Sequence, residues 1–290
     1  IALGVGALGL AGAAVFDMGR FLQAYLLGYT YFAGITIVSM FFSSLQFLVN
    51  AGWSALVRRI PEIFAGFLPV VLIGLIPMLV DVWTSHKLYH WADPQLYVPG
   101  PHFDEVLASK HAFLNPTFFT VRLAIYALIW FVTYRLIIGN SFKQDESTTD
   151  YTPTRTNMKR SAPFVLLFAM SLTFAGFDLV MSLDPHWFST MFGVYFFAGN
   201  FVSTLSLIAI FIVNLRRQGH LKGITDEHYH DIGKFMFAFT VFWTYITFSQ
   251  YFLIWYGNLP EETLFFILRA HGNWQFLGYA LVFGHFIVPF

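Results

Sequence analysis

Charged residues are missing from long stretches of this chain, and those stretches define its predicted helices. No Asp, Glu, Lys or Arg occurs in residues 21–57, 63–80, 161–177, 185–215, 235–260 and 272–290. A helix needs about 20 predominantly apolar residues to cross a bilayer. Runs such as PVVLIGLIPMLV do not alternate apolar with polar residues, which excludes an outer-membrane β-barrel pattern. The pattern therefore predicts an all-α polytopic membrane protein.

Eight visible transmembrane helices are expected in a single membrane domain, residues 1–290. We place them at about 1–16, 21–49, 63–83, 117–139, 161–183, 190–214, 232–256 and 273–290, with the first and last incomplete. The fourth contains Arg122 and Arg135 near its ends, where long side chains reach the membrane surface. The hydrophilic segment KQDESTTDYTPTRTNMKR, residues 143–160, is the predicted linker between two bundles.

The basic residues are distributed unequally between the two sides of these helices. When successive loops are assigned to alternate sides, eleven of the 16 Lys and Arg residues fall on one side. Loops that remain in the cytoplasm have an excess of basic residues. We therefore predict that loops 50–62, 140–160 and 215–231 are cytoplasmic, in a bacterial cytoplasmic (inner) membrane. The 84–116 and 257–272 loops then face outward.

Composition removes several classes of function. Apolar residues make up 57% of the chain and charged residues 11%, against roughly a quarter charged in soluble domains. The net charge is zero, which gives no basic field for nucleic acid. The chain has no cysteine, so it cannot ligate iron–sulfur clusters, and His285 is the only histidine well inside an apolar run, which disfavours an intrinsic haem. We predict no cofactor and no metal in this chain.

Two carboxylates within the predicted spans are candidates for proton transfer, because charges in a bilayer are rare and commonly functional. Asp81 lies near the outer end of a helix that is interrupted by Gly and Pro residues, although it also fits a position at the headgroups. Asp178 shares a helix face with Ser171 and Ser182.

A further polar stripe, which includes Gln46, runs along the second helix at Thr36, Ser39, Ser43, Gln46 and Asn50. Such stripes also occur where membrane helices simply pack together.

Three segments resemble the NrfD-like family, the membrane subunits of polysulfide reductase and related complexes. They are LVNAGWSALVRRIPE at 48–62, FDLVMSLDPHWFSTMFGVYFFAGNF at 177–201 and YFLIWYGNLPEET at 251–263. Within the family they are most similar to the ActF-type membrane subunit of bacterial alternative complex III, a quinol:cytochrome c (electron acceptor) oxidoreductase. The resemblance implies about ten spanning helices that form two four-helix bundles with flanking helices.

The resemblance also implies a function, that of a membrane subunit without its own redox centre. It would support assembly and proton translocation coupled to quinol oxidation, with Asp81 and Asp178 as transfer groups and His86 and His285 as further participants. Its implied partners are a homologous NrfD-like membrane subunit, outward-facing subunits with iron–sulfur clusters and c-type haems, small membrane subunits and lipids. Menaquinol or another quinol would be the electron donor.

Three alternatives stay open. The chain could be the quinol-binding sister subunit of the same complex, with Asp81, His86 and nearby tryptophans at the quinol. It could be a secondary transporter whose site is the proline-interrupted helix. It could also be a structural anchor for the outward redox subunits, held through the 84–116 and 257–272 loops.

Overall fold

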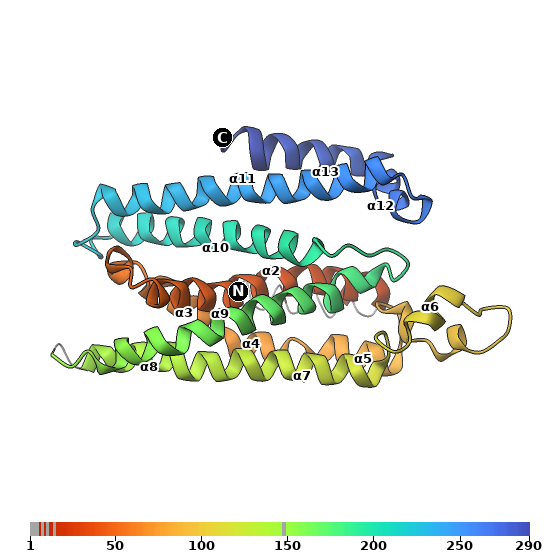
Figure 1. The fold of residues 1–290 in the computed structure, drawn as a ribbon, viewed down its shortest axis with the longest axis horizontal. Helices are drawn as coiled ribbons and strands as arrows, with labels where there is room; N and C mark the ends of the chain where they lie inside the picture. The colour runs from red at the N-terminus through yellow and green to blue at the C-terminus, as the bar shows by residue number, and fades with distance from the viewer. Residues whose placement is uncertain (1–5, 7–8, 10–11, 14–15, 147–148) are drawn as a thin grey trace.

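The described part of the chain is helical and consists of long helices that run roughly parallel to one another (Figure 1). The computed structural model describes residues 6, 9, 12–13, 16–146 and 149–290. Six helices in this part are long and apolar enough to cross a membrane. They span Met18–Leu48, Arg59–Thr84, Pro116–Glu146, Thr152–Leu183, Phe192–Arg217 and Asp226–Gly257. The chain is thus a helical, multi-pass membrane protein by the length and composition of its helices.

Two of the eight predicted spans are not among these six. The predicted helix 1–16 lies largely outside the described residues. The predicted helix 273–290 forms α13 (Trp274–Ala280) and a following π-helical segment, Leu281–Ile287, which together are shorter than the six spans.

Helix α2 (Met18–Leu48) lies at the centre of the fold and packs against α3, α9 and α10. Residues 33–40 follow one another over more than two turns and so cover the whole circumference, yet all are buried. Asp17 begins the helix by accepting a hydrogen bond from the Arg20 backbone N–H. A helix that is apolar around its circumference is stable only when enclosed on all sides, which explains this central position.

The second span is divided into three helices, as its glycines and prolines predict. These are α3 (Arg59–Ala65), α4 (Leu68–Ile73) and α5 (Ile76–Thr84), and Pro69 and Pro77 lie in the first turns of α4 and α5. The break at Gly74 is closed from α2, because the Tyr25 hydroxyl donates to the Gly74 carbonyl at 3.0 Å. Tyr29 packs so closely on Gly74 that a Cβ there would lie 2.9 Å from its ring.

The third and fourth spans complete a bundle around α2. The third comprises α7 (Pro116–Thr133), a π-helical turn (Tyr134–Ile138) and α8 (Gly139–Lys143), and the fourth is α9 (Thr152–Leu179). Helix α9 packs against both α2 and α7. The predicted linker 143–160 begins at the end of α8, and its second half is helical from Thr152 onward. Helix α8 also packs against α9.

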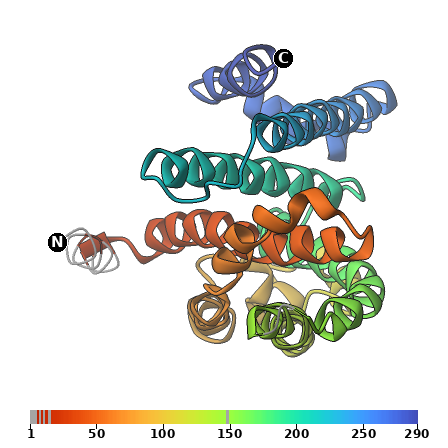
Figure 2. The same cartoon turned by 90° about the vertical axis from the view of Figure 1, so that its left-hand side faces the viewer.

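The remaining helices stack on one side of this bundle. Helix α10 (Phe192–Arg217) packs on α2 and α9, and α11 (Asp226–Gly257) packs on α10 (Figure 2). Helices α12 (Pro260–Ala270) and α13 lie against α11 and carry mostly exposed side chains.

Connections alternate between the two ends of the molecule (Figure 1). We call the end with connections 49–58, 144–151 and 218–225 the basic end. The opposite end, with connections 85–115 and 184–191, is called the loop end and includes α6 (Glu105–Lys110).

Candidate functional site

A buried ion pair joins α7 and α9 toward the loop end of the bundle. The Arg122 Nε and Nη2 atoms donate to the Asp178 carboxylate at 2.7 to 3.1 Å, and the Tyr126 hydroxyl donates to its Oδ2 atom at 2.8 Å. Asp178 is 0% exposed and Arg122 6%. We call these three residues the Asp178 cluster. The prediction that Arg122 reaches the membrane surface is wrong, because its guanidinium group turns inward to a carboxylate.

The cluster follows from helix periodicity and from the aromatic residues beside it. Arg122 and Tyr126 are four residues apart on α7 and therefore face α9 together. The Arg122 guanidinium lies 3.8 Å from the ring centre of Phe113 and 4.4 Å from that of Phe118, and its Nη1 atom donates to the Phe113 carbonyl at 2.9 Å. Each Asp178 oxygen accepts two hydrogen bonds, so the buried charges are compensated.

Ser171 and Ser182, the predicted companions of Asp178, make hydrogen bonds of their own. The Ser171 hydroxyl accepts from the Trp130 indole N–H at 3.1 Å, which extends the polar contact between α7 and α9. The Ser182 hydroxyl donates to the Asp178 backbone carbonyl at 2.5 Å, where α9 ends. Neither serine hydroxyl contacts the Asp178 carboxylate directly.

Asp81 organises the start of the long loop at the loop end. Its carboxylate accepts the Ser85 hydroxyl and the backbone N–H groups of Lys87, Leu88 and Tyr89, the latter three at 2.9 to 3.1 Å. Asp81 is 1% exposed. The contacts make Asp81 an anchor for the loop that follows α5.

Tyr89 connects the two predicted carboxylates. Its hydroxyl donates to the Leu179 carbonyl at 3.0 Å, one residue after Asp178, and its backbone N–H donates to Asp81. Burial raises the pKa of Tyr89 well above its usual value, and the charges of Asp178 and Asp81 add to this effect. The side chain is therefore a neutral hydrogen-bond donor between the two sites.

The two predicted histidines lie apart. His86 follows α5 with a φ of 53°, in the left-handed region, and its buried Nδ1 atom has no hydrogen-bond partner. His285 lies on the other side of the molecule, in the segment after α13, where its ring meets Trp243 edge to face at 4.3 Å. Within the described ranges, no three His, Cys, Asp or Glu side chains are grouped so that they could hold a metal ion.

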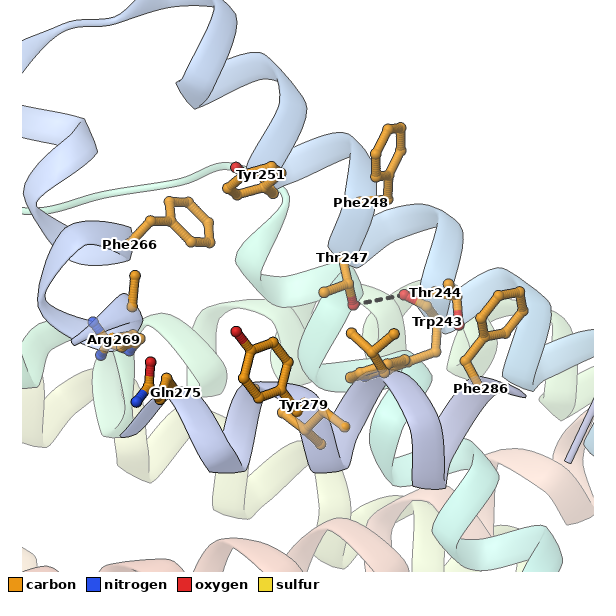
Figure 3. Close-up of a pocket in the computed structure, with 14 residues that line it drawn as sticks. Trp243, Thr244, Thr247, Phe248, Tyr251, Phe266, Arg269, Gln275, Tyr279 and Phe286 are labelled. Carbon is orange, nitrogen blue, oxygen red and sulfur yellow. Dashed lines mark hydrogen bonds between the residues drawn. The ribbon is translucent and has the colours of Figure 1, made fainter. Parts of the chain in front are cut away.

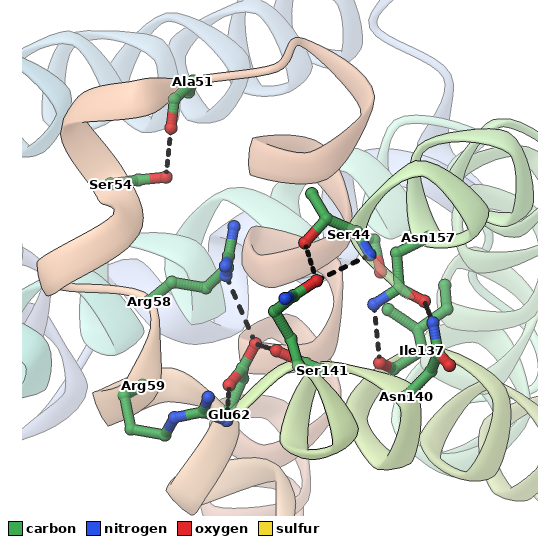
Figure 4. Close-up of polar contacts among 12 residues, drawn as sticks. Ser44, Ala51, Ser54, Arg58, Arg59, Glu62, Ile137, Asn140, Ser141 and Asn157 are labelled. Atoms are coloured by element: carbon green, nitrogen blue, oxygen red, sulfur yellow. Dashed lines mark hydrogen bonds and ion pairs between the residues drawn. The ribbon is translucent and has the colours of Figure 1, made fainter. Parts of the chain in front are cut away.

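A second buried acidic site lies near the basic end (Figure 4). It was not among the site residues predicted from the sequence. Glu62 is 1% exposed and pairs with Arg58 at 3.4 Å and Arg59 at 2.5 Å. The Ser141 hydroxyl donates to its Oε1 atom at 2.6 Å, and Arg59 also pairs with Asp145. We call these five residues the Glu62 cluster. The local spacing could have indicated these ion pairs, since Glu62 follows Arg58 by four residues and Arg59 by three.

Two asparagines hold α8 and α9 together beside this cluster. Asn157 is fully buried and donates to the Ile137 carbonyl at 2.9 Å, in the π-helical turn that follows α7. Its Oδ1 atom accepts from the Asn140 amide at 2.9 Å, as Figure 4 shows. A π-helical turn disturbs the regular ladder of backbone hydrogen bonds, and Asn157 supplies a replacement donor.

The Glu62 cluster includes residues of the 48–62 segment, one of the three on which the resemblance rests. The other two segments, 177–201 and 251–263, form contacts at the loop end. In the 184–191 connection, His186 contacts Asp104 at 2.7 Å and the Pro185 carbonyl accepts from Lys110 at 2.6 Å. The YGNLP turn ends α11 at Asn258, which has a φ of 48°, and starts α12 with Pro260. Trp187 stacks on Phe265 of α12 with ring centres 3.9 Å apart. The 184–191 connection therefore contacts both the 85–115 connection and α12.

A pocket of about 690 Å³ lies between α11 and the two helices that follow it (Figure 3). Aromatic side chains dominate its wall, among them Trp243, Tyr251, Phe266 and Tyr279. Arg269 and Gln275 lie together at one end of it, and Phe286 lies at the other. The pocket is separate from both ionic clusters and suits a flat, mostly apolar molecule with a few polar atoms.

Comparison with known proteins adds no family to this description: the chain matches no protein-family model and no curated protein sequence. The class of the protein therefore rests on its fold and sites. It is a multi-pass helical membrane protein with two buried ionic clusters toward opposite ends of one bundle.

Proposed function

We propose that this chain is an NrfD-like membrane subunit, without a redox centre of its own, of a bacterial quinol-oxidising complex. In this proposal it supports assembly and conducts protons in step with quinol oxidation. The basic end faces the cytoplasm, and the loop end faces the outward subunits that hold iron–sulfur clusters and c-type haems. The resemblance of three segments to NrfD-like subunits supports membership of such a complex, and the buried ionic groups support a role in proton transfer.

The observation that carries the proposal is the Asp178 cluster. A carboxylate, a guanidinium and a phenol share hydrogen bonds between two helices that are each long enough to cross a membrane. Ionisable groups at such depth are rare and typical of proton or ion pathways. The Glu62 cluster offers a second titratable carboxylate toward the other end of the same bundle.

In this proposal protons reach the Glu62 cluster first and the Asp178 cluster second. Protons would enter at the basic end, where Arg58 and Arg59 hold Glu62, and leave near the loop end past Asp178 and Tyr126. The rearrangement of an ion pair is a means of coupling, because the proton affinity of a carboxylate falls when a guanidinium approaches it.

Proton translocation by the reconstituted complex tests this role. Tyr126→Phe removes one hydrogen bond from Asp178 and leaves the ion pair in place, so we expect fewer protons per electron with assembly unchanged. Asp184→Asn is the matched control, because this carboxylate lies close by in sequence in the partly exposed connection that follows. An unchanged proton-to-electron ratio in both Tyr126→Phe and Asp178→Glu would remove the cluster from the path.

A second candidate function is quinol binding by this chain itself, and the pocket between α11 and α13 favours it. Its aromatic wall and its polar end with Arg269 and Gln275 match the two parts of a quinol, a hydroxylated ring and an apolar tail. Photolabelling with an azidoquinone should then modify α11 or α13, and the Tyr279→Phe substitution should reduce the yield of this labelling. Labelling confined to another subunit would leave the pocket without this role.

A further inference from the structure

Three polar side chains on one face of α2 are buried without a hydrogen-bond partner. The atoms are the Ser39 and Ser43 hydroxyl oxygens and the Gln46 Oε1 atom, and the three residues are 0%, 0% and 2% exposed. Spacings of four and three residues place them within about 60° of the helix circumference. They extend along about 10 Å of α2.

Other buried hydroxyls on α2 and on the adjacent α10 donate to a backbone carbonyl of their own helix. Thr36 donates to the Phe32 carbonyl at 2.9 Å, Ser44 to the Met40 carbonyl at 2.7 Å and Thr204 to the Asn200 carbonyl at 2.8 Å. This is the ordinary solution for a serine or threonine inside a membrane helix, because it leaves no polar group unpaired. Ser39 and Ser43 do not adopt it, so their hydroxyls require partners from elsewhere.

The surroundings indicate what those partners are. Protein atoms surround α2 on all sides at this level, since α3, α9 and α10 pack against it. Buried polar groups that lack protein partners are commonly bridged by internal water. Next to Gln46, the Phe47 ring lies 3.9 Å from the Arg58 guanidinium, which pairs with Glu62. The end of α2 that carries Gln46 thus lies near the Glu62 cluster.

We propose that water molecules occupy a file along the Ser39, Ser43 and Gln46 face of α2, continuous with the Glu62 cluster at the basic end. The file is a binding site for water within the bundle, distinct from the Asp178 cluster. Its use as a proton route from the basic end rests on the proposed function, whereas the presence of the water does not.

The absence of cysteine gives a direct test, because a single introduced thiol is then the only S–H group in the protein. Ser39→Cys and Ser43→Cys are nearly isosteric, and the S–H stretching band is followed by infrared spectroscopy after transfer into D2O. A thiol next to water exchanges its proton readily, whereas a dry one waits for local opening of the bundle.

Ser44→Cys is the matched control. Ser44 is equally buried, but it lies about 140° around α2 from Ser39 and its hydroxyl is satisfied by the backbone. We expect exchange at positions 39 and 43 to be at least about tenfold faster than at 44, which corresponds to a difference of about 1.4 kcal/mol in opening. Equal rates at all three positions, whether slow or fast, would overturn the file.

The unsubstituted protein provides a second measurement if a cysteine variant fails to fold. Radiolysis of bound water should oxidise buried Met40, Phe42 or Phe47, which neighbour the file in sequence and are 0 to 2% exposed. An unmodified 39–47 segment would count against the water.

Proton translocation by a Gln46→Leu complex then separates the two claims. Normal coupling together with rapid exchange at positions 39 and 43 would retain the water and refute the proton route alone. Impaired coupling would support both.

Discussion

Removal of the Asp178 charge should destabilise the protein, because it leaves Arg122 unpaired in the bundle. In Asp178→Asn, the guanidinium keeps only the Phe113 carbonyl as a strong acceptor, and its side chain is only 7% exposed. Breaking a buried pair on one side costs about 3–5 kcal/mol. We therefore expect a loss of this size in the free energy of unfolding, before any effect on proton transfer is considered.

A double-mutant cycle isolates the pair. Arg122→Met should be destabilising for the same reason, whereas the Arg122→Met/Asp178→Asn double variant removes both charges. Residues in direct contact commonly couple by up to about 3 kcal/mol, so the double variant should lose about 2–3 kcal/mol less than the sum of the single losses. Reversible unfolding in mixed micelles, followed by circular dichroism as the SDS fraction rises, measures all three variants.

Asp184→Asn serves again as the control and should change stability by less than about 0.5 kcal/mol, because Asp184 is partly exposed and makes no buried ion pair within the described part of the chain. Single losses below about 1 kcal/mol that add without coupling would refute this expectation, because removal of one partner of a buried, hydrogen-bonded ion pair leaves the other charge uncompensated.

Three further predictions concern the other polar sites. Asp81→Ala leaves the backbone N–H groups after α5 without their acceptor and should destabilise the protein by at least about 2 kcal/mol, with faster proteolysis of the 85–115 connection as the measure. Glu62→Gln should weaken thermal stability more than Asp145→Asn, because Glu62 is buried and Asp145 is exposed; equal melting temperatures would contradict this. The backbone N–H of Leu107 is the main cause that lowers the pKa of Asp104, with help from His186. The stabilisation contributed by the Asp104 carboxylate is therefore complete above its pKa in the unfolded chain, about 3.9. It is lost as the pH falls through the lower pKa of the folded protein. Proteolysis of this connection should thus accelerate only in acid, and Asp104→Asn should abolish that pH dependence.

Hydrophobic patterning predicted the spans well because each depends on local composition. The charge-free stretches coincide with α2, α10 and α11, and the glycine and proline spacing placed the breaks in the second span. The ends were less predictable, since helices such as α9 continue into polar sequence, where contacts with α8 hold the polar part of α9 in place.

Pairing between distant residues could not be predicted. Asp178 and Arg122 are 56 residues apart, and nothing local indicates that α7 and α9 are neighbours. Arg122 alone is indistinguishable from an arginine that reaches the membrane surface. Glu62 lies beside two arginines at a predicted helix start, a place where charges are ordinarily solvated, and only the packing of α8 buries it. Asp81 was singled out in the sequence as a carboxylate near the end of a span, but its contacts with the following loop could not be predicted.

Purification of the tagged chain from its native host is the first test of whether it belongs to a quinol-oxidising complex. After mild detergent extraction, the purified material should show c-type haem absorbance and quinol-dependent reduction of cytochrome c. A stable preparation without cytochromes and without this activity would exclude such a complex and would favour a secondary transporter with its site at the proline-interrupted helix.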